Sequence, residues 1–206
     1  MSDAHVIRIP DRAEVSKVVG LSDGGARAKA LLVDDRRDNL IALEAILQGL
    51  PVEPVAVESG AAALKQLLID DFAVILLDAQ MPEMDGFETA SHIKQRERTR
   101  HVPIIFLTAA DRDAQLALRG YAAGAVDYLT KPFDPWVLRA KVSVFVELWT
   151  KTRQLEAHAE AAKQLRTLVG AVDEAVALLR TGGEPAGALE LLERARPGPV
   201  GPGARS

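Results

Sequence analysis

The 206-residue sequence predicts an α/β protein with a parallel, doubly wound sheet. Two observations lead to this fold class: short runs of consecutive apolar residues recur along residues 29–148, and segments of helical periodicity separate them. A strand that is apolar throughout is buried on both faces, and strands separated by helices form parallel sheets through right-handed crossovers. We therefore expect helices on both faces of one sheet.

Five strands and five helices fit into this region. The expected strands are Ala30–Val33, Val52–Val57, Ala73–Leu77, Val102–Leu107 and Ala125–Leu129. The expected helices lie at 37–49, 60–70, 86–97 and 112–122, and a fifth begins near Pro135. Residues 1–28 precede the first strand, and their polar, irregular composition predicts a flexible tail with at most a short helix at Asp11–Val19.

The fifth helix is expected to continue beyond the sheet. Between Leu138 and Leu179, Gly170 is the only glycine or proline, and apolar or small residues recur every three, four or seven positions. This pattern is typical of a helix with one buried stripe, although its phase shifts near Ala162. Residues 149–181 therefore form an imperfect coiled-coil pattern that continues the fifth helix.

The chain beyond this helix has a different composition. Gly182, Gly183 and Pro185 end the long helix, and a short alanine- and leucine-rich segment follows at Ala186–Ala195. Within residues 182–206 we expect this short helix and then a disordered tail rich in Pro and Gly.

Composition excludes several classes of function. The chain has no cysteine, so disulfides, thiolate zinc sites and cysteine nucleophiles are absent, and a metal would bind to oxygen or imidazole. The net charge is −4, and residues 135–206 carry ten Lys or Arg against eight Asp or Glu, which argues against direct nucleic-acid binding. No apolar run approaches a membrane span, and no signal peptide is evident, so we expect a cytoplasmic protein without membrane insertion.

Polar residues follow four of the expected strands. Asp34 and Asp35 follow the first strand, Asp78 the third and Thr108 the fourth, while Lys131 follows the fifth. Ligands of parallel sheets bind beyond the carboxyl ends of the strands, so these side chains are expected to converge. Three carboxylates in one place require a compensating cation, and Mg²⁺ prefers oxygen ligands.

Each of these residues also has an ordinary structural interpretation. An acidic pair after a strand commonly caps a helix, a lone Asp commonly forms a turn, and a loop lysine is commonly solvated. Tyr128 is a core residue on periodicity alone, because it ends an apolar run. Unrelated caps and turns would have no reason to follow four strands of one sheet, so the joint pattern favours a site.

Four stretches resemble the receiver domain of two-component response regulators. They are LLVDD at 31–35, LLDAQMPEMDGFE at 76–88, PIIFLTA at 103–109 and GAVDYLTKPF at 124–133. The resemblance covers residues 29–148. It implies the flavodoxin-like fold of chemotaxis regulators, with strand order 2-1-3-4-5, here followed by a C-terminal helical extension.

The resemblance also implies roles for individual residues. Asp78 matches the phospho-accepting aspartate, and Asp34, Asp35 and the backbone carbonyl of Gln80 match the other Mg²⁺ ligands. Thr108 and Lys131 match the residues that contact the phosphoryl group, and the small Ala109 leaves the site open to a donor. Tyr128 matches the aromatic residue whose rotamer follows the hydroxyl, Pro132 matches a proline with a cis peptide bond, and Gln80 and Ala110 match positions that set the dephosphorylation rate.

The implied function is that of a response regulator in a two-component phosphorelay. Asp78 would accept a phosphoryl group from a sensor histidine kinase or histidine phosphotransfer protein, and catalysis would be limited to this self-modification. The output would be contact with an unknown downstream protein or a homodimer through the C-terminal helix, which could instead fold back on the receiver.

The sequence leaves two alternative functions open. The first is a constitutive scaffold. The second is a receiver joined to a degenerate histidine-kinase-like dimerisation helix at 155–180, in which Lys163 stands at the histidine position and His158 lies five residues away.

Overall fold

The computed structural model describes residues 27–108 and 127–196. The chain divides into two compact units, of which one is Ala26–Thr152 and the other contains Arg153–Ser206. None of the described helices has the length and apolar content that a membrane crossing requires.

The first unit contains a five-stranded parallel sheet with the order β2-β1-β3-β4-β5, which confirms the predicted fold class. The strands are β1 (Ala28–Val33), β2 (Val52–Val57), β3 (Val74–Asp78), β4 (Ile104–Thr108) and β5 (Asp127–Thr130). In the strand register, Val33 lies beside Leu77, and Thr108 lies beside Thr130. The carboxyl ends of these strands therefore meet at one edge of the sheet.

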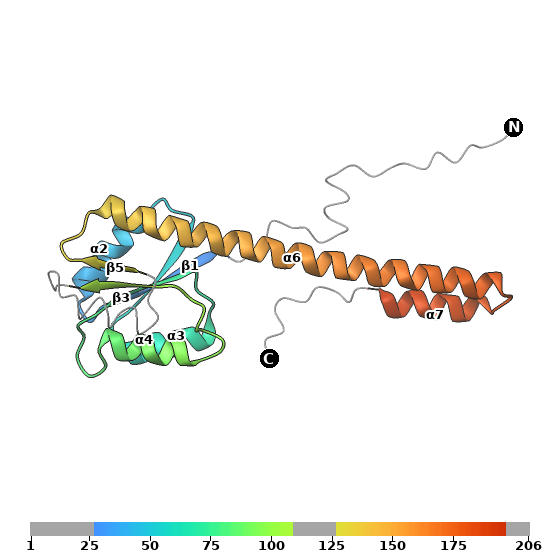
Figure 1. Cartoon of the computed structure of the whole chain (residues 1–206), viewed down its shortest axis with the longest axis horizontal. Helices are drawn as coiled ribbons and strands as arrows, with labels where there is room; N and C mark the ends of the chain where they lie inside the picture. Colours follow the sequence, from blue (N-terminus) through green and yellow to red (C-terminus); the bar gives the residue numbers. More distant parts are fainter. Residues whose placement is uncertain (1–26, 109–126, 197–206) are drawn as a thin grey trace, which may run out of the picture. The chain divides into compact units, whose positions relative to one another are not determined.

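Helices cover both faces of this sheet (Figure 1). They are α2 (Arg37–Leu47), α3 (Gly60–Ile69), α4 (Gly86–Gln95) and the first part of α6 (Pro135–Arg180). Side chains cap two of the helices, because Ser59 accepts a hydrogen bond from the Ala62 N–H and Asp85 accepts one from the Glu88 N–H. The helix expected at 112–122 lies outside the described residues.

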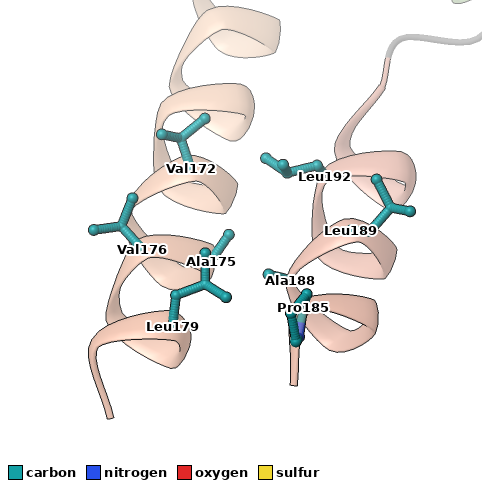
Figure 2. Close-up of a pocket in the computed structure, with 8 residues that line it drawn as sticks. All are labelled: Val172, Ala175, Val176, Leu179, Pro185, Ala188, Leu189 and Leu192. Atoms are coloured by element: carbon teal, nitrogen blue, oxygen red, sulfur yellow. The ribbon is translucent and has the colours of Figure 1, made fainter. Parts of the chain in front are cut away.

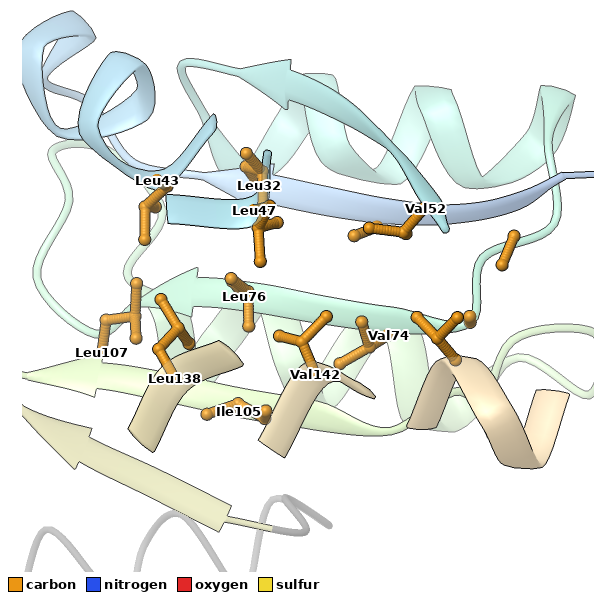
Figure 3. Packing of buried hydrophobic residues seen from close by; sticks show 14 of the residues in the cluster. Leu32, Leu43, Leu47, Val52, Val74, Leu76, Ile105, Leu107, Leu138 and Val142 are labelled. Atoms are coloured by element: carbon orange, nitrogen blue, oxygen red, sulfur yellow. The ribbon is translucent and has the colours of Figure 1, made fainter. Parts of the chain in front are cut away.

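Alternation along the strands separates the core into two layers. Leu32, Leu76 and Ile105 face α2 and α6, where Figure 3 shows them close to residues such as Leu43 and Leu138. The intervening residues of the same strands face α3 and α4 and form a second buried cluster. Both layers are closed to water, which matches the uninterrupted apolar strands in the sequence.

The second unit contains the rest of α6 and a short helix, α7 (Pro185–Ala195). Gly182 has a φ of 81°, and it allows the chain to turn back between the two helices. Ala175 of α6 and Ala188 of α7 are each only 4% exposed, so the helices pack closely through small residues. We call this pair of helices, residues 153–195, the hairpin.

The apolar stripe that the sequence predicts to be buried is exposed in the single chain. Its large members on the hairpin are 41–68% exposed, and they are Leu155, Leu165, Val169, Val172, Val176 and Leu179. Helix α7 instead covers the neighbouring residues Ala175 and Leu178.

Candidate functional site

Two buried carboxylates form the centre of the candidate site. Asp34 directly follows β1 and is fully buried, while Asp78 ends the adjacent strand β3 and is 7% exposed. Asp35 is exposed beside them, and one carboxylate oxygen from each of the three residues lies within 4.8 Å of the others. The structure therefore brings together the acidic residues that the sequence singled out.

Lys131 joins the two buried carboxylates. Its Nζ atom lies 2.8 Å from Oδ2 of Asp34 and 3.2 Å from Oδ2 of Asp78. A backbone hydrogen bond holds this lysine in place, because its N–H donates to the carbonyl of Thr108 at 2.6 Å. The peptide bond between Lys131 and Pro132 is cis. With all four groups ionised, three carboxylates and one ammonium leave a charge of −2, which a divalent cation would neutralise.

Asn39 is a site residue that the sequence analysis missed. From the first turn of α2, its Nδ2 atom donates to both carboxylate oxygens of Asp34, at 2.8 and 3.0 Å. The backbone N–H of Arg36 donates a further bond of 3.0 Å to Oδ1 of Asp34. These donors satisfy a carboxylate that has no contact with solvent and fix its orientation.

The backbone around Asp78 is tightly packed. The N–H of Gln80 lies 3.4 Å from Oδ1 of Asp78, and the N–H of Gly86 donates to the carbonyl of Ala79 at 3.1 Å. A Cβ atom added to Gly86 would lie 2.1 Å from the carbonyl oxygen of Asp78. Only glycine allows α4 to begin this close to the end of β3.

Burial raises the pKa of Asp78 above its ordinary value. Desolvation is the largest cause, the ammonium of Lys131 opposes it, and the neighbouring Asp34 carboxylate adds to it. An uncompensated charge on Asp78 is therefore costly, and a cation or a covalent modification at this carboxylate would change the local electrostatics strongly.

The remaining predicted residues lie at or near the same edge. Thr108 ends β4 and is 8% exposed, and the side chain of Gln80 is exposed. Tyr128 on β5 is 46% exposed, so its interpretation as a core residue is wrong. Ala109 and Ala110 lie outside the described residues.

A pocket of about 280 Å³ opens beside the acidic residues. Asp34, Asn39 and Lys131 line it together with apolar residues of α2, β4 and the segment after β5. The carboxyl edge of the sheet is therefore accessible from the side of this pocket, although Asp34 itself is buried.

We call the end of the sheet that carries Asp34, Asp35 and Asp78 the acidic edge. The sheet order and this acidic edge with Lys131 define a flavodoxin-like receiver fold. A family model described as the response regulator receiver domain matches residues 30–143, more than half of the chain. The chain therefore belongs to the response regulator receiver domain family. Receiver domains generally act as phosphoryl-accepting switches, bind Mg²⁺ in an acidic cleft, and interact with histidine kinases or phosphotransfer proteins.

Curated relatives are longer than this chain. Response regulator PleD of Caulobacter vibrioides is 33% identical over 144 residues, which are 70% of this chain and 32% of PleD. Transcriptional regulatory protein SrrA of Staphylococcus aureus is 33% identical over 140 residues, which are 67% of this chain and 56% of SrrA. This chain thus spans about a third of PleD and just over half of SrrA.

Solved receiver structures match the same region. Chemotaxis protein CheY4 of Vibrio cholerae has 31% identity and a TM-score of 0.55, covering 58% of this chain and 99% of CheY4. The receiver domain of sensor histidine kinase PA1611 from Pseudomonas aeruginosa has 31% identity and a TM-score of 0.54, covering 59% of this chain and 99% of its own. That structure has a magnesium ion coordinated in its active-site cleft.

The residues of this chain fit such an ion. The three carboxylates offer hard oxygen donors within 4.8 Å of one another, and their net charge with Lys131 has the magnitude that a divalent cation balances.

Proposed function

We propose that this chain is a phosphorylation-controlled switch of a two-component phosphorelay, with Asp78 as the phosphoryl acceptor. The observation that carries the proposal is the joint contact of Lys131 with Asp34 and Asp78 beside a third carboxylate. A purely structural ion pair would need one carboxylate, whereas phosphoryl transfer needs a nucleophile, a cation site and a fixed positive charge.

The side chains divide the chemistry between them. Asp34, Asp35, Asp78 and the backbone carbonyl of Gln80 would hold Mg²⁺, which supplies charge neutralisation for the transferring group. A carboxylate oxygen of Asp78 attacks the phosphorus of a phosphohistidine, the new O–P bond forms, and the electron pair of the broken P–N bond returns to the imidazole.

The product would be held by groups that already lie at this edge. The ammonium of Lys131 pairs with the phosphoryl oxygens, and the hydroxyl of Thr108 donates to one of them. By its small size, Ala109 would leave the site open to a donor, and Pro132 directly follows Lys131 in the sequence. Movement of Thr108 would then be coupled to the ring of Tyr128, which lies on the adjacent strand β5.

The proposed donor is a sensor histidine kinase or a histidine phosphotransfer protein, and the proposed place of action is the cytoplasm. The output is protein–protein contact, either with a downstream protein or with a second copy through the C-terminal helix. The nearly balanced charge of residues 135–206 supports this over direct DNA binding.

Phosphoryl labelling tests the proposal. The full chain is incubated with labelled acetyl phosphate and Mg²⁺, and we expect label on the wild type, none on Asp78→Ala, and none when EDTA replaces Mg²⁺. Asp71→Ala is the matched control, because this aspartate pairs with Arg98 at the surface and should not affect labelling. An unlabelled wild type would instead support a constitutive scaffold, and label from ATP alone would support the kinase-like helix.

A further inference from the structure

The hairpin carries two adjacent apolar rows on α6. Ala175 and Leu178 belong to the row that faces α7. The second row contains Leu155, Ala162, Val169 and Val176 at intervals of seven residues, and Leu165, Val172 and Leu179 at the same interval. Over residues 155–179 this row keeps the heptad interval through Ala162, so the phase shift expected there for the longer stripe does not break it, and its one polar position is His158. The row that α7 leaves uncovered is thus the better coiled-coil seam.

Helix α7 extends this uncovered row into a two-helix surface. Leu189 and Leu192 of α7 are 58% and 38% exposed. They line a pocket of about 290 Å³ together with Val172, Val176 and Leu179 of α6, and Figure 2 shows these residues on the two neighbouring helices. We call the surface formed by the large apolar residues of the uncovered α6 row and by the two α7 leucines the open face: Leu155, Leu165, Val169, Val172, Val176, Leu179, Leu189 and Leu192.

The hairpin does not bury a core of its own. Among the described residues 153–196, only Ala175 and Ala188 are buried. A unit of about 40 residues usually requires disulfides, a metal or oligomerisation to be stable, and this chain has no cysteine. The open face is therefore a surface that a partner must cover.

A second copy in antiparallel orientation fits this surface. Helix α7 has 11 residues and spans about 16 Å, so it flanks only the last turns of α6 and leaves Leu155 and Leu165 as a bare ridge. An antiparallel copy related by a two-fold axis near Gly170 places this ridge against the pocket of the other copy. The symmetry repeats the contact, so each copy supplies one ridge and one pocket.

Charges beside the seam agree with the same axis. Helical geometry places Arg166 and Asp173 next to the seam on the side away from α7. They are separated by seven residues, and the axis near Gly170 lies between them. Each Arg166 would therefore lie beside Asp173 of the second copy, whereas a parallel pair in register would place like charges at the same level.

We propose that two copies of this chain associate antiparallel through the open face and form a four-helix bundle. The inference rests on the proposed output by protein–protein contact, because it names the partner and the surface for that output. A helix of a different protein in the same pocket is the competing occupant, and the oligomeric state of the full chain distinguishes the two.

Sedimentation of the full chain is the first test. We expect a dimer whose dissociation constant rises at least about tenfold in Leu165→Glu and in Val176→Glu, because each buries a charge in an apolar contact. Thr167→Glu, on the outer face of α6, is the matched control and should leave the dimer unchanged. Far-ultraviolet circular dichroism checks that the variants stay helical.

A wild-type chain that is monomeric at all concentrations would overturn the inference, as would a dimer that neither glutamate variant weakens. Labelling of Asp78 is measured on the same samples. Retained labelling with no dimer would refute only the bundle, while a dimer without labelling would refute only the phosphoryl switch.

Cross-linking tests the orientation, and the absence of native cysteines makes single cysteines unique probes. Ala162 and Leu179 are 17 residues apart, or about 26 Å along the helix. In an antiparallel pair, a mixture of Ala162→Cys and Leu179→Cys chains should cross-link, and neither variant alone should do so. Cross-linking of each variant with itself would establish a parallel pair and overturn the proposed orientation.

Discussion

Helix α6 contributes to two regions with very different packing. In the receiver unit its residues Leu138 and Val142 are fully buried against the sheet, and Val146 is 3% exposed. In the hairpin the same helix carries Leu165 at 62% exposure and Val169 at 52%. One continuous helix thus changes from a core element into an exposed apolar surface.

This difference indicates how the two regions divide the function. The receiver unit has two closed core layers and holds the acidic residues and Lys131 in fixed contacts. Such contacts hold the candidate site on rigid elements of the fold. The hairpin has almost no buried residues, so its structure and its role depend on what covers it.

The largest expected effect comes from truncating one leucine in each region of α6. Leu138→Ala should lower the free energy of unfolding of the receiver unit by about 3 kcal/mol, because it leaves a cavity in a fully buried layer. Leu165→Ala, at 62% exposure, should change it by less than about 0.5 kcal/mol. Urea denaturation followed by tryptophan fluorescence measures this, since both tryptophans, Trp136 and Trp149, belong to the receiver unit.

Equal losses for the two variants would show that the hairpin is part of the receiver's cooperative unit. The comparison between the regions would then be wrong.

Two glycines provide the second contrast. Gly86→Ala should destabilise the receiver unit by about 2 kcal/mol, because the new Cβ would lie 2.1 Å from the backbone oxygen of Asp78. Gly170→Ala has no atom within 4 Å of its new Cβ, so it should stabilise α6 by up to about 1 kcal/mol. Thermal unfolding monitored by circular dichroism measures both changes, and a stabilised Gly86→Ala would contradict the close packing described here.

The sequence predicted the receiver unit well because its signals are local. Continuous apolar runs marked the strands, and the residues directly after those runs marked the edge where Asp34, Asp78 and Lys131 meet. Asn39 could not be found in this way, because an asparagine in the first turn of a helix resembles an ordinary capping residue. Only the strand-to-helix geometry places its amide on Asp34.

The hairpin was harder to predict because two apolar rows overlap in its sequence. The rows differ by a single position, as Ala175 and Val176 show, so periodicity alone could not say which one is covered. Helix α7 packs through its small residues against the row that contains Ala175, and the row of larger residues that contains Val176 stays exposed. Periodicity also failed to place Tyr128, because tertiary packing decides which side of β5 is buried.

The third prediction concerns the acidic edge. Asn39→Ala should weaken Mg²⁺ binding about tenfold, because the carboxylate of Asp34 loses the amide that fixes both of its oxygens. Titration of the full chain with MgCl₂ by calorimetry measures the affinity. Ile41→Ala, a neutral change at an exposed position of the same helix, is the control. Unchanged affinity in Asn39→Ala would show that Arg36 and Lys131 orient Asp34 without it.

The smallest expected effect is the pH dependence contributed by Asp78. Because burial raises the pKa of this carboxyl in the folded protein, ionising Asp78 costs more free energy in the folded than in the unfolded chain. The cost is absent below the ordinary pKa of 3.8 and develops as the pH rises through the higher folded-state pKa. Lys131 offsets part of it, which keeps the effect small.

Asp78→Asn removes this ionisation. In EDTA at neutral pH it should therefore raise the free energy of unfolding of the receiver unit, and the gain should shrink as the pH is lowered toward 4. Glu156→Gln is the control from the hairpin, because its ion pair with Arg153 is exposed to solvent and should contribute little to stability. A gain for Asp78→Asn that does not vary with pH would mean that packing, and not the buried charge, distinguishes the acidic edge from the exposed charges of the hairpin.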